Sequence, residues 1–325
     1  MFIYLQTDMN QNFKEIIEKY KNEKIAIAVS GGVDSISLLH LCFNEGLDIT
    51  LLHVNHKLRE NAEVEQNYVV ETAKKLKIPF KVFIWEGNKP NSNLEATARD
   101  VRYNFMIEYC KENNIKTLLT AHQADDQIET FLINLGRGSG IYGLSGISQI
   151  SKKDGINIVR PLLKTYRSDL IKYCEDNNIK YFSDEMNSDS KYTRVKIRQN
   201  RYLLNDILGI TDDRILLAIE NISRAKEVIN SSVEVLLEKN LKKDFALLDS
   251  ETLFEQPEEV QFKLISEILK RVGKNNYSPR LKSLKNALNN LRVDSKFTLS
   301  GCTIRRFKNK IIIVREGEST SFKNK

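Results

Sequence analysis

The sequence predicts an α/β fold with a doubly wound, mostly parallel sheet, followed by a C-terminal, mainly helical domain that ends in short strands. Two observations carry this prediction. In the first 180 residues, short apolar runs alternate with longer helical patterns, and such alternation folds as a parallel sheet with right-handed crossovers and helices on both faces. From about residue 202, leucine and isoleucine recur at the three- and four-residue spacings of helices, before three short β-like runs.

Apolar runs and helical periodicity locate the elements in order. Strands of the first domain are predicted over residues 25–29, 48–54, 79–85 and 117–121. Helices are predicted over residues 10–22, directly after the first strand, and over 61–77, 93–113 and 165–177. Short antiparallel strands near the end are predicted over residues 297–299, 302–306 and 310–314. A sheet of this kind binds its ligand at the carboxyl ends of its strands.

A glycine turn joins the first strand to the helix that follows it. It consists of Ser30, Gly31, Gly32, Val33, Asp34 and Ser35. Adjacent glycines bring bare N–H groups against a ligand, and the next helix adds its unpaired N–H groups and positive dipole end. A carboxylate beside phosphates would repel them, so Asp34 indicates a magnesium ion or a bound proton. These six residues therefore predict a nucleotide phosphate site; an incidental strand-to-helix turn is the alternative.

Polar residues also follow the second and fourth strands. His56 follows the second strand, and His122, Asp125, Asp126 and Glu129 follow the fourth. Acidic residues are favoured at a helix start in any case. Two aspartates facing Asp34 at a nucleotide site are better explained by magnesium, with Asp34 and Asp126 as its ligands.

Two further segments carry functional signals. Residues 135–146 contain five glycines and Arg137, which predicts a mobile lid or a backbone close to a ligand, with a flexible connector as the alternative. On the long helix, Arg99, Arg102 and Tyr103 share a face with Glu95, where a surface salt bridge from Glu95 to Arg99 is the simpler explanation.

Positive charge gathers in the second half of the chain. The net charge is +7, and residues 191–325 hold 27 lysines and arginines against 17 acids. We expect contacts with the phosphate backbone of a nucleic acid from Arg194, Arg198, Arg305, Arg306 and Lys308. A solvated basic face is the alternative explanation of this charge. The predicted organisation is a nucleotide-binding catalytic domain over residues 1–190, a basic linker over 191–215 and a nucleic-acid-binding domain over 216–325.

Composition excludes several classes of protein. Hydrophobic residues make up 41% and charged residues 29% of the chain, as in soluble globular proteins. We find no membrane-length apolar stretch and no signal peptide, and we expect a cytoplasmic location with no membrane partner. The four cysteines lie far apart without a C-x-x-C pair, which argues against an iron–sulfur or zinc site.

Taken together, the motifs resemble the bacterial tRNA(Ile)-lysidine synthetases of the PP-loop ATP pyrophosphatase superfamily. The similar segments are Ser30 to Ser35, Val54 to Arg59, Asn93 to Ala96, Arg99, Arg102–Tyr103, Thr120 to Thr130, Arg137 to Gly140, Arg160 to Leu163 and Asp184 to Arg198. The likeness covers roughly the first 200 residues in order and spacing. Two positions depart from the family pattern: Gln123 stands where a second histidine is frequent, and Val195 where an asparagine is common.

The resemblance implies an adenine nucleotide α-hydrolase-like fold and a specific reaction. ATP and Mg²⁺ would serve to adenylate the C2 oxygen of the wobble cytidine in a CAU-anticodon isoleucine tRNA, and free lysine would displace AMP to give lysidine. In this scheme Asp34, with Asp125 or Asp126, holds the phosphates through magnesium, His122 steadies developing charge, and Arg137 with the glycine loop covers the phosphates.

Other functions stay open on the sequence. Another PP-loop adenylating enzyme, such as a tRNA thiolase or a small-molecule amide synthetase, would not need lysine. A nucleotide-gated RNA-binding module would bind ATP without releasing pyrophosphate. The sequence also leaves a homodimer open beside a monomer.

Overall fold

A computed structural model describes residues 11–58, 61–87, 89–90, 94–182, 193–275 and 277–318. The chain divides into two compact units, Met1–Glu220 and Asn221–Lys325. Residues 191–215, expected to form a linker between domains, lie within the bounds of the first unit. Helix α10 (Asp212–Asn240) crosses the division.

The first unit is built on a six-stranded sheet. Its strands are β1 (Lys24–Ala28), β2 (Asp48–Asn55), β3 (Phe80–Ile84), β4 (Thr117–Leu119), β5 (Ile150–Lys153) and β6 (Ile156–Val159). They lie in the order β3-β2-β1-β4-β6-β5, and only β5 runs antiparallel to its neighbour. The strand order reverses direction between β1 and β4, and ligands of open α/β sheets bind at such a switch point.

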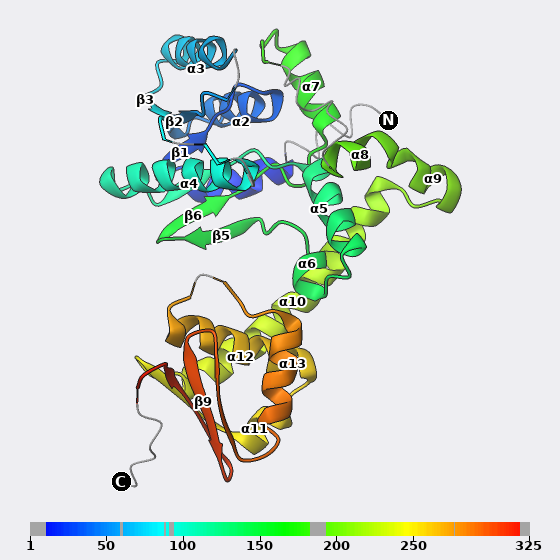
Figure 1. Ribbon diagram of the computed structural model, residues 1–325. Coiled ribbons are helices and arrows are strands. Elements are labelled where there is room, and N and C mark those ends of the chain that lie inside the picture. The colour runs from blue at the N-terminus through cyan, green and yellow to red at the C-terminus, as the bar shows by residue number, and fades with distance from the viewer. Residues whose placement is uncertain are drawn as a thin grey trace. The chain divides into compact units, whose positions relative to one another are not determined.

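Helices cover both faces of this sheet (Figure 1). The helices are α2 (Val33–Asn44), α3 (Ala62–Leu76), α4 (Leu94–Glu112) and α7 (Arg167–Asp176). Apolar residues of α2, α3 and α7 share one core with β1 and β2, including Leu38, Val69 and Leu170. Residues of α4 such as Met106 belong to a separate core on the other face, together with Ala26 of β1. The doubly wound prediction is therefore confirmed, and α4 approaches the strand ends from the face opposite α2.

The β5–β6 hairpin was not predicted from the sequence. Its turn is formed by Asp154 and Gly155, both with positive φ (49° and 92°). Asp-Gly is a strong sequence signal for a two-residue hairpin turn because both positions need positive φ. Strand β5 was overlooked because three of its four residues are polar, so it lacks the apolar run that marks the other strands.

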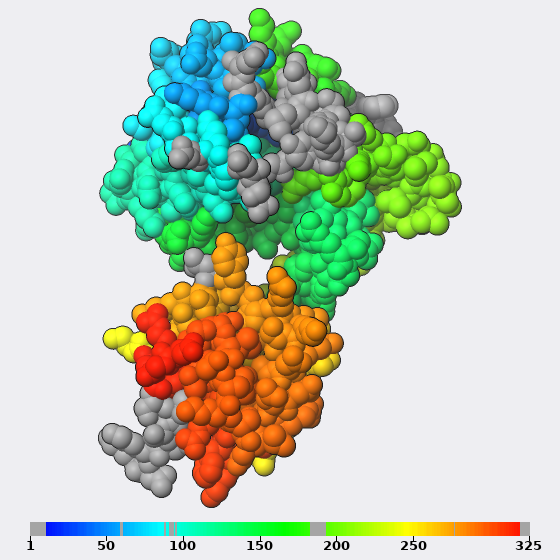
Figure 2. Space-filling model, viewed as in Figure 1, coloured from blue at the N-terminus to red at the C-terminus, as the bar shows by residue number. Residues whose placement is uncertain are grey.

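Further helices of the first unit are α5 (Ala124–Gly136), α6 (Ile141–Leu144), α8 (Thr193–Asn200) and α9 (Tyr202–Leu208). Before β1, residues 11–17 are helical and η1 (Glu18–Tyr20) follows them, close to the helix predicted over residues 10–22. Ile128 of α5 packs against Ile215 and Ile219 of α10 in a small core. Helix α9, lime green in Figure 2, lies at the surface and exposes Ile207 and Leu208.

The second unit is a four-stranded antiparallel sheet with helices on one face. Its elements are β7 (Phe245–Asp249), α11 (Ser250–Phe254), α12 (Glu258–Gly273), α13 (Leu281–Asn290), β8 (Ser295–Leu299), β9 (Cys302–Phe307) and β10 (Lys310–Arg315). The strand order is β7-β10-β9-β8. Ile265 and Leu269 of α12 pack against Ile304 and Ile313 of the sheet. Within the described residues, no helix combines the length and apolar character needed to cross a membrane.

Candidate active site

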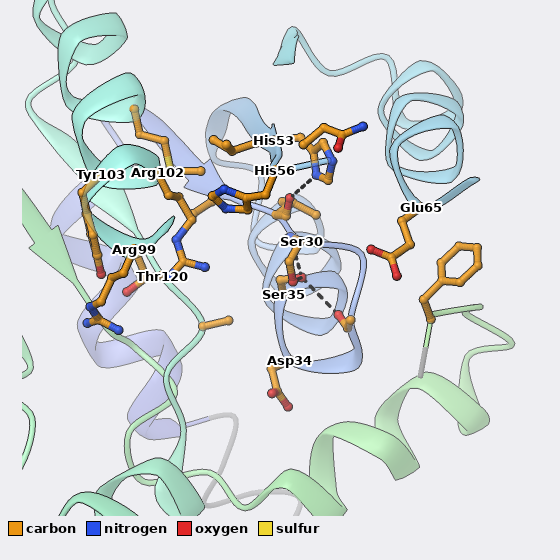
Figure 3. A pocket seen from close by; sticks show the side chains of 18 of the residues that line it. Ser30, Asp34, Ser35, His53, His56, Glu65, Arg99, Arg102, Tyr103 and Thr120 are labelled. Carbon is orange, nitrogen blue, oxygen red and sulfur yellow. Dashed lines mark hydrogen bonds between the residues drawn. The ribbon is translucent and has the colours of Figure 1, made fainter. Parts of the chain in front are cut away.

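The Ser30–Ser35 turn forms a tight cradle between β1 and α2. Ser30 N donates to Ser35 Oγ at 3.1 Å, and Ser35 Oγ donates to Gly32 O at 3.1 Å (Figure 3). Gly32 is the N-cap of α2, and no side chain caps this helix. The first N–H groups of α2 are therefore available to an anion, which is the arrangement that phosphate groups favour.

Gly31 is required by backbone conformation rather than by crowding. Its φ is +97°, and a Cβ built there would meet Val69 Cγ2 at 3.5 Å, an ordinary contact. Gly31 O accepts a hydrogen bond from Phe182 N at 3.0 Å, so the chain near residue 182 is attached to the cradle. The side chain of Val33, in contrast, is buried in the core, and only its backbone can serve a ligand.

A cavity of about 420 Å³ opens at the carboxyl ends of β1, β2 and β4. Of the residues predicted for the site, those that line the cavity are Ser30, Gly32, Asp34, Ser35, His122, Asp126 and Arg194. His56, Arg99 and Arg102 also line the cavity, as their positions at a strand end and on one helix face suggested. The cavity further includes Glu65 and Phe182, for which the sequence gave no signal.

Asp34 and Asp126 are the two predicted carboxylates that reach this cavity. Burial raises the pKa of Asp34 to about 6, against the lowering effect of Arg167. Burial also raises the pKa of Asp126, whose Oδ2 accepts from Gln123 N at 3.1 Å. Asp34 Oδ1 is buried and has no hydrogen-bond partner within the described part of the chain. A buried carboxylate oxygen without a donor suits a divalent cation, so the residues fit magnesium.

Asp125, predicted to face the nucleotide, lies outside the cavity. Its Oδ1 pairs with Arg201 Nη2, its Oδ2 accepts from Arg167 N at 2.9 Å, and it does not line the cavity. The Arg201 guanidinium also lies 3.3 Å from Asp212 Oδ2. Both oxygens of Asp125 are thus used to join α5 to the start of α7 and to Arg201, between α8 and α9, which is a structural role.

Glu129 and Arg198 form a buried ion pair. Arg198 Nε and Nη2 both lie 2.8 Å from Glu129 Oε1, and the Glu129 side chain is fully buried. Glu129 Oε2 has no hydrogen-bond partner among the described residues, and burial raises the pKa of this carboxyl. Arg198, predicted to contact tRNA, is therefore engaged with Glu129.

His122 is held neutral by its surroundings. Burial, reinforced by the positive charge of Arg99 and Arg160, lowers its pKa to about 3. Its Nδ1 lies 3.1 Å from Thr120 Oγ1. At neutral pH the imidazole carries no charge, so it can stabilise developing negative charge only through an N–H dipole.

The other predicted residues lie outside the cavity. Arg137 is exposed at the C-terminal end of α5. Gln123, one of the two departures from the family pattern, caps α5, because its side chain accepts a hydrogen bond from Asp125 N at 2.5 Å.

The basic residues of the second unit differ in their contacts. Arg305 and Lys308 lie over the Phe307 ring, at 5.7 and 5.6 Å from its centre. Arg306 instead donates to Leu291 O at 2.5 Å and to Lys308 O at 2.9 Å.

Comparisons with known proteins agree with this geometry. A PP-loop domain family matches residues 5–204. The chain is 37% identical over 309 residues to a tRNA(Ile)-lysidine synthase of Wolbachia pipientis, covering 91% of this chain and 72% of that protein. It is 35% identical over 324 residues to the corresponding synthase of Rickettsia bellii, covering 96% and 74%.

One solved structure supports the fold. A U34-tRNA thiolase from Methanococcus maripaludis, with its [4Fe-4S] cluster, superposes with a TM-score of 0.56 at 16% identity. The match covers 69% of this chain and 78% of that one. At this identity the likeness concerns the fold alone. The four cysteines of this chain are free and buried, and no group of three metal-ligating side chains occurs among the described residues.

Proposed function

This chain belongs to the tRNA(Ile)-lysidine synthase family of PP-loop proteins, and on that premise we propose that it attaches lysine to the wobble cytidine of a CAU-anticodon isoleucine tRNA. Membership makes it an ATP-binding, ligase-type enzyme of tRNA modification. The observation that best supports the finer proposal is one cavity in which the phosphate cradle, two carboxylates and several arginines meet. ATP, an attacking amine and an RNA each need one of these features.

In the first step, the cytidine C2 oxygen attacks the α-phosphorus of ATP, and pyrophosphate leaves. The bare N–H groups of the cradle, with Ser30 and Ser35, hold the phosphates in line for this attack. Asp34 and Asp126 would hold magnesium, which when bound neutralises charge on the phosphate oxygens. Neutral His122 donates a hydrogen bond to the developing charge without adding a positive charge that would hold the product.

In the second step, the lysine amine attacks C2 of the adenylated cytidine, and AMP leaves with the former C2 oxygen. The amine must lose a proton to become a nucleophile, and that proton passes to a base or to solvent. Glu129 does not serve as that base in this proposal, because its fully buried side chain pairs with Arg198 and does not line the cavity.

The decisive experiment follows both products. Purified protein is incubated with ATP and unmodified CAU-anticodon tRNA, with and without labelled lysine, and pyrophosphate and label in the tRNA are measured. The proposal expects pyrophosphate release accompanied by lysine incorporation. Pyrophosphate release without incorporation would assign a different nucleophile, and ATP binding without pyrophosphate release would indicate a nucleotide-gated binding module.

The second unit provides a paired test of the proposed tRNA contacts. Arg305 and Arg306 are neighbours on β9, so their side chains leave opposite faces of the sheet. Arg305→Gln is expected to weaken tRNA binding and to lower the slope of log affinity against log salt by about 1. Arg306→Gln removes bonds to two backbone carbonyls, and we expect a lower melting temperature with little change in affinity.

Affinity measured over a salt series, with thermal melting of each variant, separates the two roles. Equal losses of tRNA affinity in Arg305→Gln and Arg306→Gln would contradict the assignment. Unchanged affinity in Arg305→Gln would remove this face from the tRNA interface.

A further inference from the structure

Helix α4 presents a group of cations around a single aromatic ring. The guanidinium carbons of Arg99 and Arg102 lie 5.3 and 5.8 Å from the centre of the Tyr103 ring, and Lys153 Nζ of β5 lies 5.4 Å from it. Tyr103 itself is buried. Cations held against an aromatic face are partly fixed in orientation before any ligand arrives.

These charges have no neutralising partner within the described part of the chain. Neither Arg99 nor Arg102 has a described carboxylate within ion-pair distance. The contrast is with Arg198 and Arg201, which pair with Glu129 and Asp125. Burial lowers the pKa of Arg102, and the neighbouring charge of Arg99 contributes to that shift. Closely spaced like charges at a cavity wall are stabilised when an anion binds between them.

The two arginines share the cavity with the phosphate cradle but come from the other side of the sheet. Arg99 and Arg102 line the same cavity as Ser30 and Ser35. In Figure 3, Arg99, Arg102 and Tyr103 lie on one side of the cradle and Glu65 on the other. The cradle belongs to α2 and the arginines to α4, and these helices pack on opposite faces of the sheet. The cavity therefore offers two distinct positions for anions.

We propose that Arg99 and Arg102 bind a phosphodiester of the RNA backbone, next to the nucleotide that enters the cavity, rather than the phosphates of ATP. The proposal rests on the proposed function in one respect, that the substrate is an RNA. A single unpaired nucleotide reaches a cavity only together with its flanking phosphates. The planar fork of arginine matches two phosphodiester oxygens, and such contacts set the register of the strand without reading its bases.

The test separates RNA binding from ATP binding. Arg99→Gln and Arg102→Gln are compared with Lys116→Gln, a matched loss of charge at an exposed residue beside the amino end of β4. Affinity for unmodified tRNA is measured without ATP over a salt series, and affinity for a non-hydrolysable ATP analogue is measured without RNA. We expect each arginine variant to bind tRNA about 10-fold more weakly. Its salt slope should fall by about 1, with unchanged analogue affinity.

Three outcomes would overturn the proposal. Weaker analogue binding with unchanged tRNA binding would assign the arginines to ATP. No change in either affinity, or an equal change in Lys116→Gln, would remove the subsite. Arg102→Lys guards against a folding defect, because it keeps the charge and should preserve the salt slope while losing the fork geometry. Neither binding assay contains lysine or measures turnover, so a chain that makes no lysidine would still give a readable answer.

Discussion

Asp34→Asn is expected to reduce pyrophosphate release by at least about 10²–10³-fold and, at the same time, to raise the melting temperature. The loss of activity follows because the amide cannot hold magnesium as the carboxylate would. The gain in stability follows because Asp34 is a buried charge with one oxygen unpartnered among the described residues. The same carboxylate is therefore expected to lower the stability of the free protein and to contribute to catalysis once the nucleotide binds.

The pH dependence of this effect has a defined sign. The pKa of Asp34 is raised from 3.8 to about 6 in the folded chain, so the folded state holds this proton more tightly than the unfolded state. Wild-type stability relative to Asp34→Asn should therefore fall as the pH rises from about 4 to about 6, and stay level above that. The full difference is on the order of 3 kcal/mol.

Thermal melting of both proteins without nucleotide, from pH 4 to pH 8, measures the effect. Asp48→Asn is the matched control, because Asp48 is exposed at the amino end of β2, away from the cavity. It should change neither stability nor turnover. Retained turnover in Asp34→Asn would reject the metal role, and a lower melting temperature at pH 7 would reject the account based on burial.

Asp125→Ala should destabilise the protein by about 3–5 kcal/mol, because it leaves the mostly buried Arg201 without its main partner. It also removes the acceptor for Arg167 N at the start of α7. If Asp125 were instead a catalytic group, the variant would lose activity while keeping its stability. Denaturant unfolding, with pyrophosphate release measured well below the unfolding temperature, distinguishes the two.

A double variant completes this test. Asp125→Asn with Arg201→Met removes both charges, and such paired replacements are commonly close to neutral. Asp212 then loses its contact with Arg201, at small cost because its side chain is 35% exposed. Recovery of most of the lost stability is expected. A double variant as unstable as Asp125→Ala would show that the ion pair is not the source of the effect.

Much of the first unit could be predicted because its signals are local. The apolar runs of β1 and β2 and the two glycines after β1 depend only on neighbouring residues, as do turn conformation and helix periodicity. The parallel arrangement followed from chain connectivity, and it brought Asp34, His122 and Asp126 to one edge of the sheet. The opposite orientations of Arg305 and Arg306 were also available from strand alternation, although the charge count treated them alike.

The remaining assignments required contacts between distant segments. Asp125 and Asp126 are adjacent and chemically identical, and the sequence had no means of ranking them. The folded structure distinguishes them. Arg201, 76 residues further along the chain, pairs with Asp125, whereas Asp126 lines the cavity. Arg198 was likewise predicted to bind RNA because of its positive charge alone. Its ion pair with Glu129 depends on the folded structure and could not be predicted from the sequence.

By itself, the sequence determined the fold class, the phosphate cradle and the family, because short-range patterns of apolar, glycine and acidic residues encode them. Only the tertiary structure decided which charged groups form ion pairs that stabilise the first unit and which line the cavity. The physical reason is that the state of a charge depends on its burial and on its partners. Both are set by segments that meet only when the chain has folded.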